Sequence, residues 1–153
     1  MTPLIQGGSS GGGGTQGTEV GYDQITSSVN VASTTEATPT AIISCAAHTF
    51  DGAAVLLTVF APQIVSPSVL SSFVVVLLFE STTEITRLGT FLTPAAANMD
   101  QGATLLYRFT PTAGSHTYTI SAYASSTTGT PSISCGAGGT ATLNPAFARF
   151  TKV

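Results

Sequence analysis

Hydrophobic and polar residues alternate along most of the chain with a period of two, which is typical of β-strands. Turn signals rich in Gly, Pro, Ser and Thr separate these runs, as in FDGA and TPTAG. No stretch shows the 3.6-residue period and the end caps of an amphipathic helix. We predict strands over residues 22–31, 41–46, 55–61, 73–80, 85–91, 104–110, 116–124, 132–135 and 146–152. Short strands at this spacing indicate an antiparallel sandwich or barrel.

Two of these runs break the alternation. Residues 55–61 read VLLTVFA and residues 73–79 read FVVVLLF, so each is apolar on both faces, and we interpret them as partners in one hairpin. A two-sheet sandwich buries only one face of each sheet, and no predicted helix could cover the other. A second copy of the chain is therefore expected to cover it. The residues predicted to face that copy are Val74, Val76, Leu78, Leu56 and Phe60.

The first 21 residues differ in composition from the rest. They hold eight of the 16 glycines, and GGSSGGGG is typical of a flexible tether. The apolar Leu4 and Ile5 precede the glycines and are predicted to anchor this tether on a neighbouring subunit or another protein. We therefore divide the chain into an N-terminal arm, residues 1–21, and one domain, residues 22–153, which is long enough to bury a core.

Charged residues make up only 7% of the chain, against roughly 25% in an average soluble domain. The polar surface is instead mostly hydroxyl, because the chain has 26 Thr and 17 Ser. A surface with so little charge favours association, as expected of a protein that works inside a larger assembly.

The four basic residues form no cluster, which argues against nucleic-acid binding. No apolar run reaches the ~18–20 residues that span a bilayer, and no signal peptide is evident, so we expect no membrane partner and assembly in a cytoplasm.

Two cysteines and two histidines offer little chemistry. Cys45 and Cys135 lie in apolar strand contexts, where buried free thiols are the favoured interpretation, and a disulfide stays open if the two strands are neighbours. His48 and Asp51, with Ser115 and His116, could be written as base, acid and nucleophile, but HTFDG and GSHTY fit strand ends and Gly turns better. The two histidines could also meet at a metal between copies, without an obvious third ligand. We predict no catalytic residue, no metal and no cofactor.

The arginines are more informative in so uncharged a chain. Arg87, Arg108 and Arg149 are each expected to pair with a carboxylate, and Glu80 with Arg87 across a hairpin is one such prediction. The candidate carboxylates are Asp23, Glu36, Asp51, Glu80, Glu84 and Asp100.

Several stretches together carry a resemblance to a known family. They are the Gly-rich arm, TEVGYDQITSSVNVASTTEA, TFDGAAVLLTVFAP, TPTAGSHTYTISAY and the terminal NPAFARFTKV. From about Tyr22 to Val153 the chain resembles small virion proteins of tailed phages that form trimers of a jelly-roll similar to the C1q and tumour-necrosis-factor-like fold. The resemblance implies a jelly-roll of about 8–10 strands and a homotrimer in which one sheet faces the threefold axis.

The commonest role in this group is that of a capsid decoration, or cement, protein that bridges neighbouring major capsid proteins. The resemblance therefore implies a viral structural protein on the capsid surface of the virion, with the major capsid protein as partner of the arm or the trimer. The alternatives are a tail-fibre or tail-tip protein that binds a receptor, and a lectin-like carbohydrate-binding module. The absence of Trp disfavours the lectin, and an enzyme is the least favoured class.

Overall fold

The structure is a computed structural model that describes residues 15–153. The described residues form ten strands and no helix. The strands are β1 (Glu19–Ile25), β2 (Val29–Asn30), β3 (Thr40–Asp51), β4 (Val55–Val65), β5 (Phe73–Glu80), β6 (Thr83–Leu92), β7 (Asp100–Phe109), β8 (Ala113–Ala124), β9 (Ser132–Ser134) and β10 (Ala146–Lys152).

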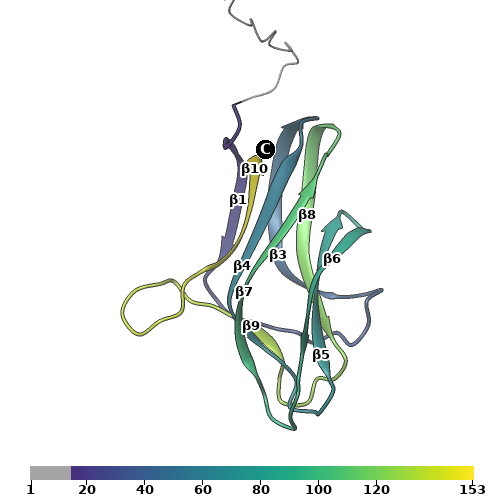
Figure 1. Ribbon diagram of the computed structural model, residues 1–153, viewed down its shortest axis with the longest axis vertical. Coiled ribbons are helices and arrows are strands. Elements are labelled where there is room, and N and C mark those ends of the chain that lie inside the picture. The colour runs from purple at the N-terminus through teal and green to yellow at the C-terminus, as the bar shows by residue number, and fades with distance from the viewer. Residues whose placement is uncertain (1–14) are drawn as a thin grey trace, which may run out of the picture.

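These strands form two antiparallel sheets packed face to face (Figure 1). The six-stranded sheet has the order β1-β10-β4-β9-β2, and β7 pairs with the free side of β4. The four-stranded sheet has the order β3-β8-β5-β6. The chain changes sheet after β2, β3, β4, β6, β7 and β8, so strands adjacent in sequence mostly lie in different layers. This strand order confirms the predicted all-β, antiparallel jelly-roll sandwich.

Some predicted boundaries and pairings differ. The predicted strand 22–31 is two strands, and the first begins at Glu19, three residues inside the predicted arm. The predicted hairpin of residues 55–61 with residues 73–79 is wrong, because β4 and β5 belong to different sheets. The connection 66–72 crosses between the layers, and β4 pairs instead with β10, β9 and β7.

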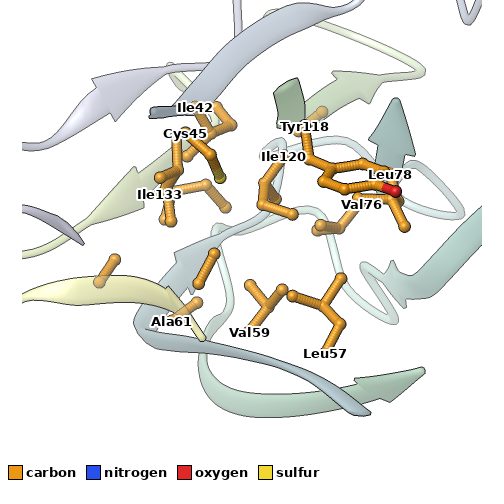
Figure 2. Close-up of a cluster of buried hydrophobic side chains, with 14 of the residues drawn as sticks. Ile42, Cys45, Leu57, Val59, Ala61, Val76, Leu78, Tyr118, Ile120 and Ile133 are labelled. Atoms are coloured by element: carbon orange, nitrogen blue, oxygen red, sulfur yellow. The ribbon is translucent and has the colours of Figure 1, made fainter. Parts of the chain in front are cut away.

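The space between the sheets holds the main hydrophobic core. Figure 2 shows Leu57, Val59 and Ala61 of β4 facing Ile120 and other side chains of the opposite sheet. Burial of each Leu, Val or Ile side chain in this core contributes about 1.5–3 kcal/mol. The predicted period of two is confirmed in β4 and β8, where alternate residues point into this core.

Three residues predicted to face a second copy lie in that core. Val74, Val76 and Leu78 are 0%, 3% and 0% exposed within a single chain. They pack between the two sheets with the rest of the cluster, and Figure 2 shows Val76 and Leu78 in this position. The prediction of these three as interface residues is therefore wrong, because these even-numbered residues of β5 point into the core between the two sheets.

The other parity of β5 is also buried, on the outer side of the four-stranded sheet. Val75 and Leu77 are 2% and 0% exposed and cluster with Tyr123, Phe73 and Phe79. We call this outer side the covered face. Its cover comes from residues 31–39, the cover segment, which connects β2 to β3.

Two contacts show the path of the cover segment. The Ala124 N–H at the end of β8 donates to the Ser33 carbonyl at 2.9 Å. Glu36 then forms a bidentate ion pair with Arg87 of β6, and Arg87 lies opposite Leu77, hence on the same side of the sheet. Because β5 lies between β8 and β6, the segment crosses β5 on its outer side. The chain thus covers the second face of FVVVLLF itself, and this run alone does not require another copy.

Candidate interaction surface

The outer side of the six-stranded sheet is built differently. Here β1, β10, β4 and β7 lie side by side, and the residues that alternate with the core positions point away from the sandwich. We call this side the open face. Its residues include Tyr22 and Gln24 of β1, Phe147, Arg149 and Thr151 of β10, Leu56, Thr58 and Phe60 of β4, and Thr104, Leu106 and Arg108 of β7.

Aromatic rings form a continuous strip across three strands of the open face. The ring centroids of Tyr22 and Phe147 are 5.4 Å apart, and so are those of Phe147 and Phe60. Tyr22 is 42% exposed and Leu106, on the fourth strand, is 61% exposed. An apolar strip of this kind on a soluble domain marks an interaction surface.

The open face also holds both arginines that lack an ion pair. Of the four Lys and Arg residues, Arg87 pairs with Glu36 and Lys152 pairs with Asp51. Arg108 and Arg149 make no ion pair within residues 15–153, and both project from the open face. Among the described residues, the predicted carboxylate partner is found for Arg87 and not for Arg108 or Arg149. The predicted Glu80–Arg87 pair is wrong, because Glu80 binds His116 instead.

The predicted interface residues thus divide into three groups. Leu56 and Phe60 lie half-buried on the open face, where a partner can reach them. Val74, Val76 and Leu78 lie in the core, as described above. Leu4 and Ile5 fall outside the residues that the structure describes, so their role as anchors stays a prediction.

Sequence reasoning missed Tyr22, Phe147 and Leu106. Each lies on an ordinary alternating strand, where a single outward apolar residue is unremarkable. Only the strand order, which brings β1, β10, β4 and β7 together, makes them one patch.

One end of the sandwich holds a second group of polar side chains. Asp23 of β1 reaches across to the four-stranded sheet, where its Oδ2 lies 2.6 Å from His48 Nε2 and its Oδ1 accepts the Ala46 N–H at 2.9 Å. Burial raises the pKa of Asp23, but the bonds from Ala46 and His48 outweigh burial and leave this pKa below its usual value. The pair links the two sheets.

Gly21 makes this link possible. A Cβ at residue 21 would lie 2.5 Å from the His48 ring, so a larger residue would displace the histidine. The TEVGYD stretch therefore combines Gly21, which leaves space for the His48 ring, with Asp23, which binds that ring.

Cys45 lies beside the same carboxylate, in surroundings that disfavour its thiolate form. Burial, and then the charge of Asp23, raise the pKa of the Cys45 thiol to about 12, so the thiol stays protonated. Cys45 and Cys135 are both buried and unbonded, which confirms the interpretation as free thiols.

His116 forms its own pair within the four-stranded sheet. Its Nδ1 binds Glu80, and its Nε2 lies 2.9 Å from the Thr112 carbonyl. The hydrogen bond to Glu80 raises the pKa of His116, against the opposing effect of burial. The neighbouring Tyr118 hydroxyl is buried without a hydrogen-bond partner in the described chain, and burial raises its pKa to about 12.

The catalytic constellation considered from sequence is not assembled. His48 binds Asp23 rather than Asp51, and Asp51 binds Lys152 at 2.7 Å. His48 and His116 lie opposite each other on β3 and β8, yet each is turned to its own carboxylate. Within residues 15–153, no three His, Cys, Asp or Glu side chains are placed to hold a metal.

The cavity that the described residues leave between the two sheets is too small for an organic ligand. The cavity between the sheets, lined by Ile42, Val59 and Ile120 among others, has a volume of about 10 Å³, close to the smallest space that holds one water. The described residues also contain no helix with the length and apolar character to cross a bilayer. The open face, with its aromatic strip and the exposed Leu106, is the strongest candidate for a functional surface.

Comparison with known proteins adds no relative. No protein-family model matches the chain, and no curated protein is significantly similar to it.

Proposed function

We propose that the chain is a virion structural protein: a homotrimer that decorates a phage capsid and bridges neighbouring major capsid proteins. The open face is the observation that supports self-assembly, since it combines an aromatic strip with two arginines that make no ion pair among the described residues. The proposed role on a phage capsid rests on a resemblance, since the strand stretches and the Gly-rich arm are similar to those of small trimeric virion proteins.

Two further features support an assembled structural role over a soluble carrier or binding module. Only 7% of the residues are charged, and four of the seven carboxylates are already in ion pairs of the chain. The closely packed core leaves surfaces, not an internal site, as the means of action.

The first test is the mass of the purified chain by light scattering. The proposal expects three times the 15.4 kDa of one chain, and a single-chain mass at all concentrations contradicts it. The second test is the abundance of the chain in particles purified from a phage whose genome encodes it. A decoration protein occurs in hundreds of copies per particle, whereas a tail-tip protein occurs in tens at most, so a low count favours the tail alternative.

The tether is tested separately. Residues 1–14 precede every strand of the described fold, so their deletion should leave a folded trimer. Binding of this trimer to capsids that lack the protein should be weaker than binding of the full chain. Equal binding contradicts the tether role of Leu4 and Ile5.

A further inference from the structure

On the six-stranded sheet, two carboxylates and two arginines make no ion pair with any residue that the structure describes. Four of the other carboxylates are in ion pairs, namely those of Asp23, Glu36, Asp51 and Glu80. The fifth, Glu84, interacts electrostatically with Arg87. Glu19 on β1 and Asp100 on β7 make no ion pair within residues 15–153. Both are exposed and both lie on strands of the sheet that carries the open face.

The register of the strands places one of these carboxylates level with an arginine. A single row across the open face holds, in order, Glu19, Thr151, Leu56 and Arg108. Glu19 is on the edge strand β1 and Arg108 is on the opposite edge strand β7. Three strand spacings separate them by about 14 Å, too far for an ion pair within one chain.

Asp100 lies at a different level. It is eight residues from Arg108 on β7, which is about 27 Å along the strand. The two carboxylates therefore distinguish between two ways in which copies can pack on this face.

A rotation about an axis that runs along the strands leaves every residue at its own height. In a head-to-tail ring of this kind, the β7 edge of one copy meets the β1 edge of the next. Residues of the same row then meet, which brings Arg108 to Glu19. In an antiparallel twofold arrangement, heights are reversed and Arg108 meets the end of the face that holds Asp100.

We propose that copies of this chain close into a head-to-tail ring through the open face, in which Arg108 of each subunit pairs with Glu19 of the next. This inference rests on the proposed homotrimer and specifies its contact. Glu19 and Arg108 carry opposite charges at opposite ends of one row, as such a ring requires. If the aromatic strip were buried without a carboxylate near Arg108, this arginine would be left desolvated and unpaired, which is costly. Complementary charges at an interface contribute mainly to specificity, so each Arg108–Glu19 pair helps to determine which edges meet.

The test is a charge exchange measured as the concentration at which the oligomer dissociates. Glu19→Arg and Arg108→Glu each place like charges together at every contact of the ring, and each should raise the dissociation midpoint roughly tenfold or more at low salt. The double variant restores opposite charges and should return the midpoint to within about threefold of the wild type. In 1 M salt, where the screening length is about 3 Å, the effects of the single variants should shrink.

Asp100→Arg is the matched control on the same face. Combined with Arg108→Glu, it should give no rescue, and a rescue by Asp100→Arg in place of Glu19→Arg establishes the antiparallel arrangement and overturns the ring. Single reversals without effect, or a double variant without recovery, also overturn the Arg108–Glu19 contact while the trimer itself stands. A wild-type chain that stays single at all concentrations removes the proposed function and this contact together. Circular dichroism and thermal melting of each variant show that the fold is intact.

Discussion

Val75 and Leu77 on the covered face are 2% and 0% exposed, whereas Tyr22 and Leu106 on the open face are 42% and 61% exposed. The two faces belong to the same sandwich and are both apolar, so composition does not explain the difference. The covered face has the cover segment, which Glu36 fixes to Arg87. Within residues 15–153, no such segment crosses the open face, and its two arginines make no ion pair there. A face that a chain buries with its own residues contributes to folding, and a face left open is available for assembly.

The largest expected effect separates the two faces directly. Leu77→Asp places a charge where the covered face is fully buried, and the free energy of unfolding should fall by roughly 3–5 kcal/mol. Leu77→Met is the matched control and should cost less than about 1.5 kcal/mol. Chemical denaturation at a fixed protein concentration measures both. A loss below 1 kcal/mol for Leu77→Asp would mean that the cover segment does not exclude water from β5.

The matching change on the open face is Leu106→Asp. Because Leu106 projects into solvent in the single chain, its replacement should leave the fold intact but place three charges inside the trimer contacts. The trimer should dissociate at concentrations at least about tenfold higher than the wild type. Light scattering over a dilution series gives the midpoint, and an unchanged trimer would place the contact elsewhere.

The pH dependence of stability distinguishes the His116–Glu80 pair, which lies within the four-stranded sheet, from the Asp23–His48 pair, which links the two sheets. The pKa of His116 is raised by Glu80, so this pair stabilises the fold fully below the unfolded pKa of about 6.5, and the contribution is lost as pH rises through the folded pKa. The pKa of Asp23 is lowered, so its contribution is present above the unfolded pKa of about 3.9 and is lost as pH falls through the folded value.

Stability curves of two variants check these signs. His116→Gln should flatten the decline in stability above pH 6.5, and Asp23→Asn should flatten the decline in acid. A decline above pH 6.5 that is the same in His116→Gln and the wild type would show that the pair with Glu80 does not cause it.

The smallest effect is expected from loosening the cover segment. Glu36→Gln removes the charge that binds Arg87, an exposed pair whose loss should change overall stability little. Its effect should instead be local, as increased binding of an apolar dye to the uncovered Val75 and Leu77. Thr35→Ala, beside it in the same segment, is the control and should bind no more dye than the wild type. Equal dye binding by Glu36→Gln and the wild type would mean that this ion pair does not hold the segment in place.

The strands and their inward residues could be predicted from the sequence because the period of two is a local property. Tyr118, Ile120 and Ala122, which alternate along β8, all lie in the core. The sheet to which each strand belongs is not local. Residues 73–79 gave no sign of which parity would face the core, since both are apolar, and the interface residues Val74, Val76 and Leu78 were assigned to the wrong side for this reason.

The cover segment and the open face could not be predicted for a related reason. VASTTEATP has no apolar pattern, and its position depends on an ion pair between residues 51 positions apart in sequence. The open face is assembled from four strands spread between Glu19 and Lys152. A carboxylate partner was predicted for every arginine, but among the described residues only Arg87 has one, because the pairing depends on register.

Hydroxyl-radical footprinting of the concentrated wild-type protein tests most directly whether copies of the chain cover the open face. Tyr22 and Leu106 should be oxidised far more slowly than their exposure in a single chain implies, while Leu92, which is equally exposed at 61% but lies on β6, should react at its full rate. Dilution below the dissociation midpoint should restore the reaction at Tyr22 and Leu106. Oxidation of Leu106 as fast as that of Leu92 at every concentration would contradict the account.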